Sequence, residues 1–259
     1  MTKGKRIIAI YFSATDTTKK YVDSVVSVFC HAADIYINLA DDMNISLPEI
    51  THKDIVILAA PVYGGRLPEW VADRFKQLKG NGAYAISIVV YGNRDYDDAL
   101  LELVDITTEN NFNVVGAAAF IGQHSIFPRV AQHRPDRSDI KVALEFAEKC
   151  KEAILTEKRG NLEIKGNRPY KKIMSVGLTP KVDGELCNRC GQCAANCPAD
   201  AISTVNPTVT LTDKCISCGR CITHCPRHAR KYSGLKYKII GAIFTRAFSK
   251  KRESEYMVL

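Results

Sequence analysis

The sequence lacks the features that mark several large classes of protein. Within its 259 residues no apolar run approaches the ~20 residues that span a bilayer, and the basic start is not followed by a small-residue cleavage site. It contains neither the Gly-Lys-Ser/Thr loop of a nucleoside triphosphate site nor the G-x-G-x-x-G of a dinucleotide site. No Ser/His/Asp or paired-carboxylate constellation stands out. We therefore expect a soluble protein whose chemistry is carried by other residue types.

Cysteine is concentrated in one part of the chain. Eight of the ten cysteines fall between Cys187 and Cys225. A disulfide framework of this density is typical of secreted proteins with a signal peptide, so we expect metal or cluster ligation in a reducing cytoplasm. The pattern C-x2-C-x2-C-x3-C-P occurs twice, 28 residues apart, at Cys187–Pro198 and Cys215–Pro226. This fixed period indicates a duplicated unit.

The spacing of these cysteines favours iron–sulfur clusters over the alternative of two structural zinc sites. Zinc sites use separate C-x2-C pairs, whereas three thiolates at even spacing can wrap one cubane cluster. The repeat resembles the two-cluster ferredoxins over about 50 residues. The resemblance implies two [4Fe–4S] clusters, with the last cysteine of each run serving the other cluster. The implied ligands are Cys187, Cys190, Cys193 and Cys225 for the first cluster, and Cys215, Cys218, Cys221 and Cys197 for the second.

One residue near the clusters departs from the ferredoxin pattern. Arg230 stands where ferredoxins usually carry an apolar side chain. A nearby cation favours the more negative, reduced form of a cluster. We therefore expect Arg230 to make the two clusters electrostatically unequal.

The part of the chain before the cysteines alternates short apolar runs with longer amphipathic stretches. Short apolar runs between turn signals are typical of buried parallel strands, and the pattern predicts a doubly wound, parallel five-stranded α/β sheet. The predicted strands are Arg6–Phe12, Asp34–Leu39, Ile55–Ala60, Ala83–Val90 and Val114–Phe120. The predicted helices are Thr17–Cys30, Pro68–Leu78, Asp97–Asn110 and Ser138–Thr156.

Three loops follow predicted strands at the sheet edge where such folds bind ligands. The first offers hydroxyl groups and helix N-terminal amides to an anion, and the other two offer glycines for close approach and tyrosines for stacking on a flat ring. The candidate residues are Ser13, Thr15, Asp16, Thr17, Thr18, Pro61, Val62, Tyr63, Gly64, Gly65, Tyr91, Gly92, Asn93 and Tyr96. Trp70 is expected to pack rather than to cover a ligand, and His52, His124 and His133 have no metal spacing.

These loops resemble those of the flavodoxins, and the whole chain resembles the flavodoxin–ferredoxin fusion family. The resemblance implies FMN, with its phosphate on Ser13–Thr18, its isoalloxazine between the two tyrosine loops, and a glycine peptide at Gly64 or Gly65 facing the reduced ring. Asp16 departs from the family, which carries glycine there. Either its carboxylate points outward to cap the helix, or FMN binds weakly. The predicted division is a flavodoxin-like domain (1–158), a basic linker (159–182), a small α+β two-cluster ferredoxin-like domain (183–234) and a basic amphipathic tail (235–259).

The net charge is +8, and the excess of basic residues lies on both sides of the cysteine block. Because thiolate clusters and a phosphate would offset most of it, we expect no nucleic-acid partner. The tail is expected to form a helix with Ile239, Ile240, Ile243 and Phe244 on one face. This face is expected to pack on its own domain, in preference to a partner or an anionic membrane surface. The function expected is electron transfer between clusters, flavin and redox protein partners. A flavin-dependent reductase and an iron–sulfur redox or oxygen sensor are the alternatives.

Overall fold

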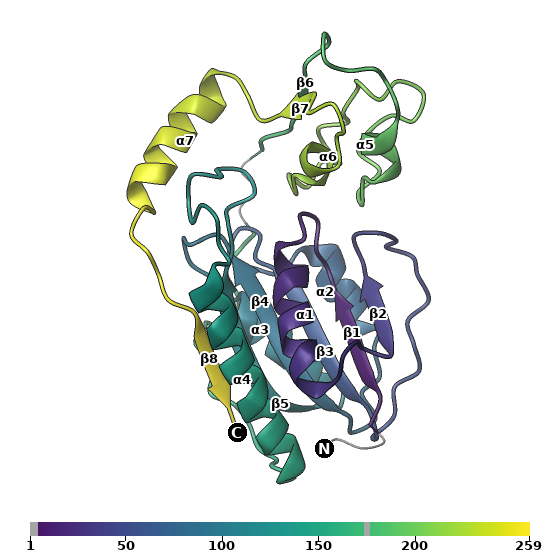
Figure 1. Cartoon of the computed structure of the whole chain (residues 1–259), viewed down its shortest axis with the longest axis vertical. Coiled ribbons are helices and arrows are strands. Elements are labelled where there is room, and N and C mark those ends of the chain that lie inside the picture. The colour runs from purple at the N-terminus through teal and green to yellow at the C-terminus, as the bar shows by residue number, and fades with distance from the viewer. Residues whose placement is uncertain (1–4, 174–176) are drawn as a thin grey trace.

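The computed structural model describes residues 5–173 and 177–259. Residues 1–4 of the predicted first domain and 174–176 of the predicted linker lie outside this part. A twisted sheet covered by helices forms the larger layer, and a small unit with short helices lies above the carboxyl ends of its strands (Figure 1).

The central sheet has the strand order β2-β1-β3-β4-β5-β8. Its first five strands pair in parallel, and this order is that of flavodoxin-like doubly wound folds. The predicted fold class is thereby confirmed. These strands are β1 (Ile7–Tyr11), β2 (Ile35–Asn38), β3 (Ile55–Pro61), β4 (Tyr84–Tyr91) and β5 (Asn113–Ile121).

Four helices cover the two faces of the sheet, which is why its strands read as continuous apolar runs. In β1, Ile7 and Ala9 pack into the core under α1 and α4, whereas Ile8 and Ile10 pack into the core on the opposite face. The covering helices are α1 (Thr17–Phe29) and α4 (Arg137–Leu155) on one face, and α2 (Glu69–Lys76) and α3 (Ala99–Glu109) on the other.

The five predicted parallel strands are present, and the C-terminal segment adds a sixth strand that the sequence did not predict. β8 (Glu255–Val258) pairs antiparallel with β5 (Figure 1). Without it β5 would present a row of unpaired backbone groups at the sheet edge. Tyr256 and Val258 extend the core on one face, and Met257 extends it on the other.

The predicted tail helix is shorter than 235–259 and packs by a different face. It spans α7 (Leu235–Ala247), where Ile240 and Phe244 pack against a small core and Ile239 and Ile243 are 52% and 66% exposed. Phe244 contacts the rings of His124 and Phe127, at centroid distances of 4.8 and 4.9 Å. The tail therefore packs on the chain's own first domain. Within residues 5–173 and 177–259, no helix combines the length and apolarity needed to cross a bilayer.

The small unit repeats one backbone conformation at the 28-residue period of its sequence. Gly191 and Gly219 precede its two short helices with φ of 77° and 80°, and Arg189 and Ser217 have φ of 58° and 55°. The duplicated sequence thus folds into two equivalent loops. The elements are β6 (Lys181–Val182), α5 (Gln192–Ala195), α6 (Arg220–Thr223) and β7 (Arg230–Lys231), with β6 and β7 paired antiparallel.

The predicted linker is attached to α3 by specific contacts. The backbone N–H groups of Asn167 and Lys171 donate to the buried carboxylate of Asp98, at 2.9 and 2.7 Å. Arg168 and the Tyr170 hydroxyl both bind Asp105. These bonds set the path by which the chain passes from the sheet to the small unit.

Candidate functional site

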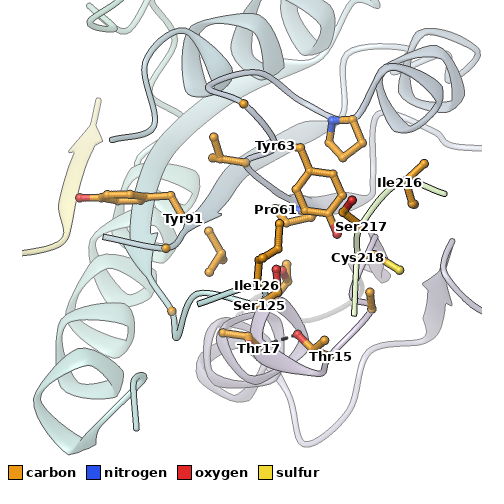
Figure 2. A pocket seen from close by; sticks show the side chains of 18 of the residues that line it. Thr15, Thr17, Pro61, Tyr63, Tyr91, Ser125, Ile126, Ile216, Ser217 and Cys218 are labelled. Atoms are coloured by element: carbon orange, nitrogen blue, oxygen red, sulfur yellow. Dashed lines mark hydrogen bonds between the residues drawn. The ribbon is translucent and has the colours of Figure 1, made fainter. Parts of the chain in front are cut away.

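A cavity of about 360 Å³ lies at the carboxyl ends of β1, β3, β4 and β5. This volume is within the range of small-ligand and cofactor sites. Its wall combines loops of the sheet domain with Cys215–Cys218 of the small unit, and Figure 2 shows Tyr63 on the side of Ile216, Ser217 and Cys218, with Tyr91 on the other. Of the predicted flavin residues, those in the wall are Ser13, Thr15, Thr17, Thr18, Pro61, Val62, Tyr63, Gly64, Tyr91 and Gly92.

The loop after β1 gathers hydroxyl groups at the start of α1. The Ser13 hydroxyl accepts the backbone N–H of Lys19 at 3.1 Å, and the hydroxyl groups of Thr15 and Thr17 lie 3.5 Å apart (Figure 2). Asp16 takes the left-handed conformation at φ 60°, is exposed and does not line the cavity. The carboxylate that departs from the flavodoxin pattern is therefore outside the predicted phosphate position.

Aromatic side chains and glycines line the part of the cavity suited to a flat ring. Trp70, which we expected only to pack, does both: its ring meets Phe12 edge-on at 4.6 Å, and it lines the cavity. Gly64 lines the cavity with φ of 63°. Gly65 does not line the cavity. A Cβ at this position would stand 2.1 Å from the carboxylate oxygen of Asp97.

Two predicted flavin residues bind the C-terminal segment instead of lining the cavity. Asn93 Nδ2 donates to the carbonyl oxygens of Phe248 and Lys250, at 2.8 and 2.9 Å. The hydroxyl of Tyr96 donates to Glu255 at 2.7 Å. Their loop reaches the cavity through Tyr91 and Gly92, but these two side chains contact the C-terminal segment.

Sequence reasoning missed the loop after β5, which supplies a fourth side of the cavity. Gly122, His124 and Ile126 all line it. Burial lowers the pKa of His124 to about 4, and its Nδ1 accepts the backbone N–H groups of Ile126 and Phe127 at 3.2 Å each. The imidazole is therefore neutral at pH 7. This loop could have been predicted from the sequence, because it directly follows the fifth predicted strand.

The structure brings the predicted ligands of the second cluster together around one small cavity, lined by Cys197, Cys215, Cys218 and Cys221. Cys218 is also a member of the hydrophobic core of the sheet domain, where Tyr63 and Ile216 pack. Burial raises the pKa of the Cys218 thiol to about 12. A thiolate here needs a strong positive partner, which is the chemistry that iron supplies.

The predicted ligands of the first cluster line a separate cavity, formed by Cys187, Cys190, Cys193 and Cys225. Arg230 is buried in its wall and donates to Thr210 at 2.9 Å and to the carbonyl of Pro207. The two cavities are equivalent in detail, because Ala201 N–H donates to Cys197 Sγ and Ala229 N–H to Cys225 Sγ, both at 3.3 Å. Cys190 is exposed, so this end of the small unit faces solvent.

Comparison with known families identifies the small unit. Residues 179–226 match the 4Fe-4S dicluster domain. The match implies two [4Fe–4S] clusters, as the cysteine spacing predicted, and it begins at residue 179, inside the predicted linker. The combination of a flavodoxin-like sheet with a dicluster domain is therefore established, whereas the assignment of each cysteine stays a prediction.

Several solved structures resemble part of the chain at low sequence identity. They include rubredoxin oxygen:oxidoreductase from the anaerobe Desulfovibrio gigas, at 14% identity and a TM-score of 0.43 over 59% of this chain and only 36% of that chain. Oxidised flavodoxin 1 from Bacillus cereus matches at 18% and 0.43, over 57% of this chain and 98% of that one. Fusobacterium nucleatum flavodoxin bound to flavin mononucleotide matches at 16% and 0.42, over 57% and 98%. A search of curated protein sequences found no match.

Proposed function

We propose that this chain is an electron-transfer protein in which FMN, bound in the 360 Å³ cavity, exchanges electrons with the two clusters of the dicluster domain. The observation that carries the proposal is the position of Cys218. This predicted ligand of the second cluster lines both the cluster cavity and the large cavity, and it packs in the same core as Tyr63. A flavin in the large cavity would thus lie against the second cluster.

The residues in the cavity fit FMN. The hydroxyl groups of Thr15 and Thr17 and the N-terminus of α1 would hold the phosphate. Tyr63 and Trp70 would pack on the isoalloxazine. At Gly92 a Cβ would stand 2.6 Å from the His124 ring, so only glycine leaves room for the imidazole beside the ligand.

The arrangement suggests an order of electron carriers. FMN takes up one or two electrons, whereas each cluster carries one, so together they can connect one-electron and two-electron partners. The first cluster cavity lies away from the sheet domain, and its ligand Cys190 is exposed. We place the docking site of external redox proteins at that end, and the whole reaction in the reducing cytoplasm.

The cover over the large cavity favours a relay over a reductase with an open substrate site. Ile216 and Ser217 close one side, and Ile126 lies opposite Tyr63 in the wall (Figure 2). A flavin in this cavity would thus be covered on one side by the chain's own cluster loop.

Anaerobic purification followed by iron, acid-labile sulfide and flavin analysis tests this function. We expect about eight iron atoms, eight sulfides and one FMN per chain. Stepwise reduction, followed by absorbance and electron paramagnetic resonance, should then reduce flavin and clusters in the same molecule. Clusters without flavin, after incubation with excess FMN, would contradict the proposal. Rapid turnover of a small acceptor at the flavin would favour the reductase instead.

A further inference from the structure

Arg220 connects the second cluster cavity to the predicted phosphate loop. It is the first residue of α6, is only 5% exposed and lines the cavity of Cys197, Cys215, Cys218 and Cys221. Its guanidinium leaves the dicluster domain and donates to the carbonyl oxygen of Ser13 at 3.3 Å, and it forms an ion pair with Asp41. Both partners belong to the sheet domain.

One nitrogen of this guanidinium has no partner. Nε of Arg220 is buried and donates no hydrogen bond in the structure, although a buried donor left unpaired costs about 1–3 kcal/mol. The side chain therefore carries an unused donor in the wall of the cavity that would hold the cluster.

The internal repeat supplies a comparison within the same chain. Shifting Arg220 by 28 residues gives Gln192, the first residue of α5, which lines the first cluster cavity but is exposed and uncharged. The backbone around the two positions is equivalent, so the loop itself does not require an arginine. What differs is the neighbour: α6 faces the sheet domain, where Ser13 and Asp41 receive the guanidinium.

We propose that Arg220 sets the reduction potential of the second cluster by donating its Nε–H to that cluster, while Ser13 and Asp41 of the flavodoxin-like domain hold the guanidinium in place. The cation stabilises the more negative, reduced form of the cluster and so raises its potential. Because Ser13 and Asp41 belong to the sheet domain, Arg220 makes this potential depend on the docking of the two domains. The inference rests on the proposed cysteine ligands of the second cluster and does not require that FMN binds.

The test compares wild-type protein with Arg220→Gln, which installs the side chain found in the first repeat. Both midpoint potentials are measured by titration under electron paramagnetic resonance, after iron and sulfide analysis has shown that both clusters are present. In Arg220→Gln we expect the midpoint potential of the second cluster to fall by at least about 59 mV, which is a tenfold change in its one-electron equilibrium. The midpoint potential of the first cluster should stay the same. Iron loss in Arg220→Gln would show that this variant fails to assemble its clusters, and the comparison then rests on Arg220→Lys.

Two further variants make the result decisive. Arg227→Gln removes an equal charge from an exposed side chain in the wall of the first cluster cavity, and we expect less than a twofold shift. Arg220→Lys keeps the positive charge but lacks the Nε–H, so the potential of the second cluster should fall by part of the amount seen in Arg220→Gln. This variant also provides a measurement if Arg220→Gln fails to assemble its clusters. Unchanged potentials in fully loaded Arg220→Gln, equal shifts of both clusters, or wild-type potentials in Arg220→Lys would each overturn the proposal.

Discussion

Asn93 allows a direct comparison between the flavin role predicted from sequence and the structural role found in the fold. Its side chain, 3% exposed, makes three hydrogen bonds to the C-terminal segment: two from Nδ2 to Phe248 and Lys250, and one at Oδ1 from the N–H of Arg252 at 3.2 Å. At about 1 kcal/mol each, these bonds contribute about 3 kcal/mol to holding the segment against the sheet.

Asn93→Gly is the cleaner perturbation, because Asn93 has φ of 63° and glycine adopts this conformation without strain. Asn93→Ala removes the same hydrogen bonds and adds about 1 kcal/mol of left-handed strain. A loss of about 3 kcal/mol corresponds to local opening that is more frequent by on the order of 100-fold. Hydrogen–deuterium exchange of residues 248–259 should therefore accelerate by about that factor in Asn93→Gly, and further in Asn93→Ala.

The affinity for FMN separates the two roles. We expect it to change by less than about threefold in Asn93→Gly, because the side chain faces the tail and not the cavity. Wild-type exchange in the tail of Asn93→Gly would refute this reasoning. Loss of FMN affinity with an unchanged tail would restore the role predicted from the sequence.

Three other substitutions test neighbouring parts of the account. Tyr96→Phe removes the bond to Glu255, worth about 1.5–3 kcal/mol for a charged acceptor, and should accelerate exchange in β8 without changing the iron content. Gly92→Ala places a Cβ 2.6 Å from the His124 ring and should weaken FMN binding by about tenfold or more in a fluorescence titration, with both clusters retained. Asp136 caps α4, and hydrogen bonds from Ser138 and the Asp139 N–H lower its pKa from the usual 3.8 to about 2. The capping carboxylate therefore stabilises the folded protein fully above pH 4, and this contribution is lost as the pH falls to 2. In chemical denaturation, Asp136→Ala should cost about 1 kcal/mol of the free energy of unfolding at pH 7. This difference from wild type should disappear between pH 4 and pH 2.

The parallel strands could be predicted because a strand buried on both faces of a sheet is apolar along its whole length, which is visible in the local sequence. Ile7–Tyr11 is buried throughout, and the predicted strand Arg6–Phe12 differs from it by one residue at each end. β8 could not be found in this way. Its four residues, Glu255–Val258, gain strand structure only from the unpaired edge of β5, which lies more than a hundred residues earlier in the chain.

The side chains around the site were predicted less well than the loops, because their partners come from distant segments. A helical wheel groups Ile239 with Ile240, but α7 packs only on one side, so Ile240 faces Phe127 and Ile239 faces solvent. Arg220 lies inside an iron–sulfur motif that gives no hint of Asp41, its ion-pair partner 179 positions away. The expectation that Arg230 makes the clusters unequal considered one arginine, whereas each cluster cavity has a buried arginine in its wall.

Reduction of the clusters by a light flash, followed by the rate at which the flavin is reduced, tests the central claim most directly. With Cys218 in the wall of the large cavity, electrons should pass within one molecule. The rate should therefore be first-order and the same at every protein concentration. A rate that rises in proportion to protein concentration would show that electrons pass only between molecules, and it would contradict the account.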